Sequence, residues 1–154
     1  MTTFKTDAVK SGIMPDDLRA GMVLCRVGTY TIPSSSKPAV GDTIQMVPVP
    51  KNAKILNIHL TTDGVGGSTC KVDVGDGGDT NRYDSSVTIK SATHVDCKED
   101  DNQLCTTYSA DDTIDLVVAS AAPATASKKI EMIVLYTMEG TLSDQDTDAS
   151  SKIP

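Results

Sequence analysis

The sequence predicts an all-β protein, an antiparallel β-sandwich of the jelly-roll kind with about eight strands. Apolar and polar residues alternate in several short segments, which is the pattern of half-buried strands. Turn residues separate these segments at short intervals, without the alternation of strands and helices that builds parallel sheets. With one Phe, four Tyr and no Trp, the core must be built from aliphatic side chains. An up-and-down barrel is the alternative architecture.

Taken in order, the segments predict strands at 22–32, 42–49, 55–61, 69–75, 87–90, 104–108, 113–120 and 128–138. Gly28 predicts a bulge in the first strand. Pro48 and Pro50 place the end of the second strand at a sheet edge or corner, because proline cannot donate a ladder hydrogen bond. In the last strand Ile133 and Leu135 make the second face apolar, which predicts a strand that is central or covered on both sides.

Residues 48–84 form the centre of the predicted fold. They are expected to make a strand, a hairpin turn at Asp63-Gly64, a returning strand, and a loop rich in glycine and aspartate. Asp-Gly is among the strongest short hairpin signals. Alternation across this region and the later strands predicts a core that contains Leu56, Ile58, Leu60, Val72, Val74, Ile114, Leu116, Val134 and Tyr136.

The chain of 154 residues fits one domain. We expect an extended N-terminal arm over residues 1–17, a β-sandwich domain over 18–140 and a flexible acidic C-terminal tail over 141–154. Two interpretations of the arm stay open: simple disorder, or ordering against a neighbouring molecule. For the second, its apolar residues Phe4, Val9 and Ile13 are the interface candidates.

The net charge of −7 excludes nucleic acid and anionic membranes as expected partners, since both need clustered Lys and Arg. The first ten residues lack the apolar segment of a signal peptide, so we expect synthesis in the cytoplasm. The four cysteines follow no C-x-x-C spacing. Cys25 and Cys70 are expected to be buried thiols. A disulfide between Cys97 and Cys105 stays open, although a cytoplasmic origin favours free thiols.

Three carboxylates spaced by glycines, Asp73, Asp76 and Asp79, are weak candidates for a Ca²⁺ site, because Ca²⁺ takes oxygen ligands from flexible loops. Their spacing does not match an EF-hand loop. The simpler interpretation is a tight turn whose carboxylates accept backbone hydrogen bonds, and we predict no metal and no cofactor.

Arg82 and Tyr83 end the same loop. Arg82 is expected to pair with Asp76, Asp79 or Asp84 and hold the loop closed. Arg82 and Tyr83 are also interface candidates, because both residue types are enriched at interfaces.

No arrangement of residues predicts an enzyme. His59 and His94 are the only histidines, and an isolated histidine is not a zinc site or a general base. No nucleophile motif and no phosphate-binding loop is present. We therefore predict no catalytic residues.

Two segments together resemble a known family. VPVPKNAKILNIHL and CKVDVGDGGDTNRYD are similar to segments of small structural proteins of tailed-bacteriophage heads, the capsid decoration or cement proteins. The resemblance covers residues 41–92. It implies a jelly-roll-like protein that binds the outside of an assembled capsid and stabilises contacts between capsomers. It also implies the major capsid protein as partner, a dimer or trimer, and a location on the virion surface.

The alternative is a tail-associated or lectin-like module that binds a glycan. The scarcity of aromatic residues argues against a sugar platform. The acidic tail has no counterpart that the resemblance explains.

Overall fold

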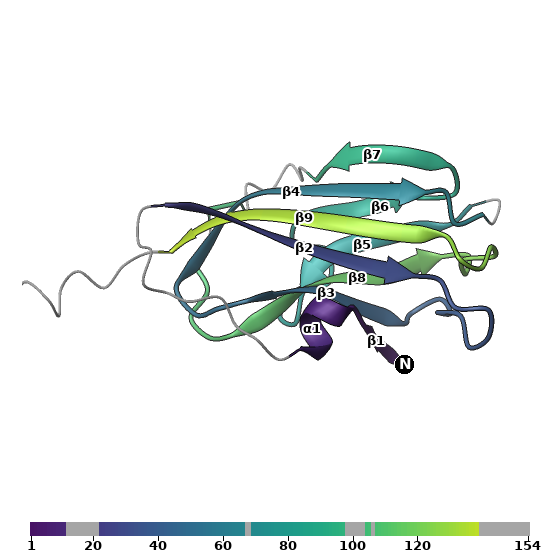
Figure 1. Ribbon diagram of the computed structural model, residues 1–154, viewed down its shortest axis with the longest axis horizontal. Coiled ribbons are helices and arrows are strands. Elements are labelled where there is room, and N and C mark those ends of the chain that lie inside the picture. Colours follow the sequence, from purple (N-terminus) through teal and green to yellow (C-terminus); the bar gives the residue numbers. More distant parts are fainter. Residues whose placement is uncertain (12–21, 67–68, 98–103, 106, 139–154) are drawn as a thin grey trace, which may run out of the picture.

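The computed structural model describes residues 1–11, 22–66, 69–97, 104–105 and 107–138. Within these residues the chain forms nine strands and one short helix (Figure 1). The elements are β1 (Thr3–Lys5), α1 (Asp7–Lys10), β2 (Val23–Thr31), β3 (Thr43–Val49), β4 (Ala53–Asp63), β5 (Lys71–Asp76), β6 (Asp84–Thr88), β7 (Ala92–Asp96), β8 (Asp112–Ser120) and β9 (Lys129–Met138). None of the described helices is long and apolar enough to cross a membrane.

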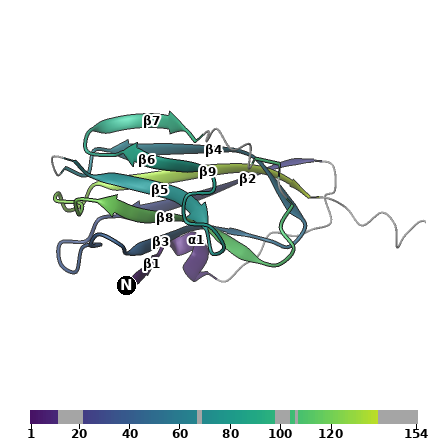
Figure 2. The ribbon, with the colours of Figure 1, turned by 180° about the vertical axis from the view of Figure 1, so that it is seen from behind.

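The strands form two sheets, with the orders β1-β3-β8-β5-β6 and β2-β9-β4-β7. The two sheets lie one behind the other, as opposite views show (Figures 1 and 2). The antiparallel pairs are nested: β2 with β9, β3 with β8, β4 with β7, and β5 with β6. This is a long hairpin rolled into two layers, the jelly-roll topology, and it confirms the predicted fold class. An up-and-down barrel is excluded, because it would place successive strands side by side.

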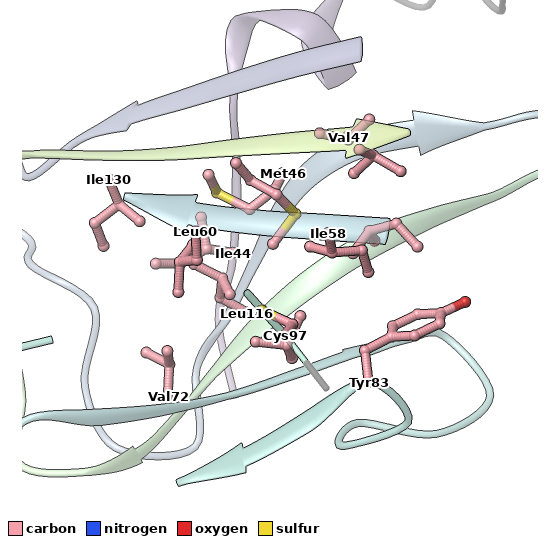
Figure 3. Packing of buried hydrophobic residues seen from close by; sticks show 14 of the residues in the cluster. Ile44, Met46, Val47, Ile58, Leu60, Val72, Tyr83, Cys97, Leu116 and Ile130 are labelled. Carbon is pink, nitrogen blue, oxygen red and sulfur yellow. The ribbon is translucent and has the colours of Figure 1, made fainter. Parts of the chain in front are cut away.

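The core lies between the sheets and is mainly aliphatic (Figure 3). Eight of the nine predicted core residues are buried, and the exception is Leu56. The register of β4 against β9 shifts between Ile55 and Asn57. This irregularity breaks the alternation, so Ile55 enters the core and Leu56 is only half-buried.

The predicted hairpin at Asp63-Gly64 is wrong. β4 and β5 lie in opposite sheets, so this segment carries the chain across the sandwich. Gly64 and Gly66 have φ angles of +83° and +72°, which favour glycine, and Val65 between them is buried. The turn chemistry was recognised correctly, but a turn does not specify which strand becomes the partner.

The predicted bulge at Gly28 is also wrong, since β2 pairs with β9 without a shift from Val23 to Thr31. Gly28 is needed for a close approach instead, because an added Cβ would overlap the carbonyl oxygen of Met46. Pro48 does lie at a sheet edge. β1 covers one side of β3 only from Thr43 to Gln45, so beyond that point this side of β3 has no partner strand among the described residues.

The N-terminal residues pack on the same chain's sandwich. β1 runs parallel to β3, and the side chain of Thr6 caps α1 by accepting a hydrogen bond from the amide of Val9. This differs from an arm that is extended throughout residues 1–17, although residues 12–21 lie outside the described part. The acidic tail predicted at 141–154 also lies outside it.

Two further segments differ from the predictions. β7 was not predicted, and of the strand expected at 104–108 the described residues 104–105 and 107–108 show only an isolated bridge between Lys54 and Thr107. All four cysteines are free thiols, so no disulfide joins Cys97 to Cys105. Cys25 was expected to be buried, but it is exposed because it lies on the outward phase of β2.

Candidate functional site

The loop after β5 is organised around the carboxylate of Asp76, which is almost fully buried. Its Oδ1 accepts hydrogen bonds from the amides of Gly78 and Asp79, each at 2.9 Å. Its Oδ2 lies 2.6 Å from Nε of Arg82 and accepts a hydrogen bond of 2.8 Å from the hydroxyl of Tyr108. Of the partners considered for Arg82, the structure therefore gives Asp76, and the ion pair closes the loop.

This cluster connects the two sheets at one end of the sandwich. The hydroxyls of Tyr83 and Tyr108 are 2.6 Å apart. The carbonyl of Tyr108 accepts a hydrogen bond from the amide of Asn52, just before β4, and its amide donates one to the carbonyl of Ala53, the first residue of β4. β4 lies in the opposite sheet from Asp76. Beside the cluster lies a cleft of about 230 Å³, which is lined by Asp76, Gly78, Arg82, Tyr83, Thr107, Tyr108, Ser109 and Asp112.

Burial dominates the electrostatics of this end. It raises the pKa of Tyr108 and of Tyr83 above the ordinary value, so both hydroxyls stay protonated at neutral pH. Burial alone would lower the pKa of Arg82, but its hydrogen bond to Asp76 and that residue's charge reverse the effect, and the pKa is raised. Burial also raises the pKa of Asp115, on β8, to about 7.

The three candidate Ca²⁺ ligands do not converge. Asp73 accepts a hydrogen bond of 2.7 Å from the amide of Ser86, on β6. Asp76 is bonded to the amides of Gly78 and Asp79 and paired with Arg82. Asp79 accepts a hydrogen bond of 3.3 Å from the amide of Asn81. Asp76 and Asp79 thus accept hydrogen bonds from amides of their own loop, whereas Asp73 accepts one from the neighbouring strand β6.

A second polar cluster lies on the outer face of the other sheet, and the sequence reasoning missed it. His59 on β4 and His94 and Asp96 on β7 hold their ligand atoms within 4.8 Å of one another. The signal is the spacing His94-Val95-Asp96, which puts two ligands on one face of a strand. It was missed because β7 was not predicted.

The outer face of β2 and β9 is apolar along part of its length. Val23 and Val27 are 63% and 47% exposed. Val27 is paired with Ile133 on β9, and Cys25 with Leu135, both half-buried. We call these five residues the outer strip. The apolar second face of β9 was predicted correctly, as was the central place of this strand in its sheet.

The interface candidates Phe4 and Val9 of the arm pack against the chain's own sandwich. The ring of Phe4 meets that of Tyr30 edge-on, with centroids 6.0 Å apart. Val9 is half-buried in α1, which packs against β2 and β3. Ile13 lies outside the described residues.

The sequence matches no protein-family model and no curated protein. The fold is similar to solved structures. A chain in the capsid of Ralstonia phage GP4 has a TM-score of 0.74 and 21% identity, over 89% of this chain and 98% of that one. A chain in the capsid of cyanophage Pam1 has a TM-score of 0.66 and 19% identity, over 80% and 89%.

A third similar chain occurs in the capsid of Helicobacter pylori bacteriophage KHP30, with a TM-score of 0.54 and 17% identity, over 79% of this chain and 91% of that one. At these identities the likeness establishes a shared fold, a jelly roll found in chains of three phage capsids.

Proposed function

We propose that this chain is a non-enzymatic virion protein that binds the outer surface of an assembled phage capsid and stabilises contacts between capsomers. One observation carries the proposal: between 79% and 89% of this chain shares a fold with 89–98% of chains in three phage capsids. The partner is the major capsid protein, and the protein acts as a dimer or trimer.

The outer strip supports a role in binding. Most large apolar side chains of the described residues are buried, and Val23 and Val27, on β2, are among the few that are exposed. Burying these residues against a capsid subunit would remove apolar surface from water, at about 25 cal/mol per Å². We therefore expect the strip to lie in the contact with the capsid.

Assembled shells present repeated composite sites that free capsid subunits lack. An oligomer of this protein engages several of them at once, and linked binding events gain from a high effective concentration. The protein should therefore bind assembled heads and not free capsid subunits.

Co-sedimentation with undecorated heads and with free capsid subunits tests the proposal. The unaltered protein should pellet with heads and should not bind free capsid subunits. Val27→Glu should weaken this binding about tenfold or more, because it would bury an unpaired carboxylate in the apolar contact. Thr31→Glu is the matched control, because Thr31 is exposed on the same strand and pairs with Lys129 at its polar end.

If the unaltered protein does not pellet with heads, capsid binding is wrong. If it pellets and both variants bind equally well, the outer strip is not the contact surface.

A further inference from the structure

The cluster of His59, His94 and Asp96 lies where β4 pairs with β7, the outermost strand of its sheet in both ribbon views (Figures 1 and 2). In the described part of the chain it is the one group of three potential ligands whose donor atoms converge. The exposed fractions of the three side chains are 25% for His59, 59% for His94 and 41% for Asp96. The cluster is therefore held by the sheet but open to solvent.

The strand register brings the three residues together. Antiparallel pairing places His59 opposite Asp96 and Thr61 opposite His94. Residues two apart on a strand share a face, so all four side chains project from the outer face of this sheet. The two imidazole rings lie nearly parallel, with centroids 5.6 Å apart. The arrangement is a property of two paired strands and does not depend on a loop.

One of the donor-atom distances matches a zinc site, and a second is shorter than a zinc site needs. Two ligands on tetrahedral Zn²⁺, with bonds of about 2.0–2.1 Å, are separated by roughly 3.4 Å. Nε2 of His94 lies 3.4 Å from Oδ1 of Asp96. Nδ1 of His59 lies 2.5 Å from the same oxygen, as a hydrogen-bonded pair. Replacing the shared proton with a metal ion requires these two atoms to separate by about 0.9 Å.

Thr61 orients the second histidine. Its Oγ1 lies 2.9 Å from Nδ1 of His94. If Nδ1–H donates this hydrogen bond, the lone pair of Nε2 is directed to the side of Asp96. Metal-binding histidines commonly use their other nitrogen in this way, which fixes the tautomer and the ring.

We propose that His59, His94 and Asp96 bind one divalent transition-metal ion, with Zn²⁺ the best fit. The ligands are Nδ1 of His59, Nε2 of His94 and a carboxylate oxygen of Asp96, and water takes the fourth position. Two imidazoles and one carboxylate are ligands that Zn²⁺ accepts. The net charge of −7 further favours a cation. The site is independent of capsid binding.

The bound ion would cross-link the edge strand β7 to its neighbour β4. β7 pairs along its length with β4 alone. Two ligands from β7 and one from β4 would join these strands through the metal. Because the folded state brings the ligands together, binding should stabilise it by mass action.

The test is calorimetric titration of the full chain with ZnCl₂ at neutral pH. A Cys25→Ser/Cys105→Ser background removes the two exposed thiols, because cysteine is itself a zinc ligand. We expect one ion per chain. Asp96→Asn should weaken binding at least about tenfold, and Thr61→Val should weaken it by about tenfold. Glu131→Gln is the matched control, since Glu131 lies on the same face but outside the cluster, and it should bind as the background does.

Two independent readouts identify the ligands. The chain has only two histidines, so both imidazoles can be followed by NMR, and both should shift in parallel during the titration. Amide exchange should slow in β7 when zinc is added. Absence of binding at about 100 μM Zn²⁺ would overturn the proposal, as would equal affinity of the Asp96→Asn and Glu131→Gln variants.

Discussion

Asp76 and Asp96 both lie beside a basic nitrogen, but they differ in burial and in the number of protein groups that they contact. The side chain of Asp76 is 3% exposed and meets two amides, a tyrosine hydroxyl and Arg82. The side chain of Asp96 is 41% exposed and faces two imidazoles on an edge strand. Both oxygens of the first carboxylate are already engaged by protein groups, and the second carboxylate is open to a ligand. The difference separates a structural cluster from a binding site although both use an aspartate.

Removing Asp76 gives the largest expected effect. Asp76→Ala leaves the buried end of Arg82, two amides and Tyr108 without their acceptor, so the free energy of unfolding should fall by ~3–5 kcal/mol. Asp96→Ala in metal-free protein should cost less than about 1 kcal/mol, because exposed ion pairs contribute little. Urea denaturation measures both, and equal losses would remove the distinction between the two aspartates.

A third carboxylate, that of Asp115, extends the comparison, because it is buried and one of its oxygens, Oδ1, lacks a hydrogen-bond donor in the part of the chain that the structure describes. Burial, and to a lesser extent Asp112 and Asp76, raise its pKa to about 7. Between about pH 4 and pH 7 the unfolded chain has lost this proton and the folded chain retains it, so stability falls as the pH rises through this window.

Asp115→Asn should remove that dependence. A pKa difference is worth about 1.4 kcal/mol per unit, so the variant should be more stable than the unaltered protein by ~2–4 kcal/mol at pH 8, with the advantage vanishing near pH 4. Thermal unfolding measured from pH 4 to pH 8 checks this. A constant difference across the range would mean that Asp115 does not titrate as expected.

Period-two alternation predicted most of the core because a sandwich strand buries every second residue. It misplaced Leu56, since the irregularity in β4 becomes visible only when the strand is paired with β9. β7 carries few apolar residues and Val95 alone of the central three is hydrophobic, so no hydrophobic pattern marked it. The partner strands of the Asp-Gly turn are set by contacts distant in sequence.

The two polar clusters were predictable to different degrees, because their residues lie at different separations along the sequence. Asp76 and Arg82 belong to one short loop, so their pairing could be expected from local sequence. Tyr108 completes that cluster from a distant segment, and nothing near it in the sequence indicates Asp76 as a partner. His59 and His94 meet only through strand register, which the alternation of either segment alone does not specify.

Thr6 tests whether the N-terminal residues belong to the sandwich. Its hydroxyl donates a hydrogen bond of 2.5 Å to the carbonyl of Met46 and caps α1. Thr6→Ala should lower the free energy of unfolding by ~1–2 kcal/mol, the usual cost of losing such a cap. Thr3→Ala, at an exposed position of β1, is the control and should have little effect. Equal stability of the two variants in urea would indicate that the arm contributes nothing to the isolated domain.

Ca²⁺ should have the smallest effect on stability. Comparing Ca²⁺ with Zn²⁺ tests the aspartate loop against the histidine cluster. Ca²⁺ takes six to eight oxygen ligands, yet the carboxylates of Asp73, Asp76 and Asp79 already accept backbone hydrogen bonds and do not converge. An ion would have to displace those bonds and the ion pair with Arg82, so millimolar Ca²⁺ should change the melting temperature by less than about 1 °C. Zn²⁺ at the same concentration should raise it through the His59, His94 and Asp96 cluster. A rise of more than about 5 °C with Ca²⁺, reversed by chelator, would show that the loop opens to bind the ion.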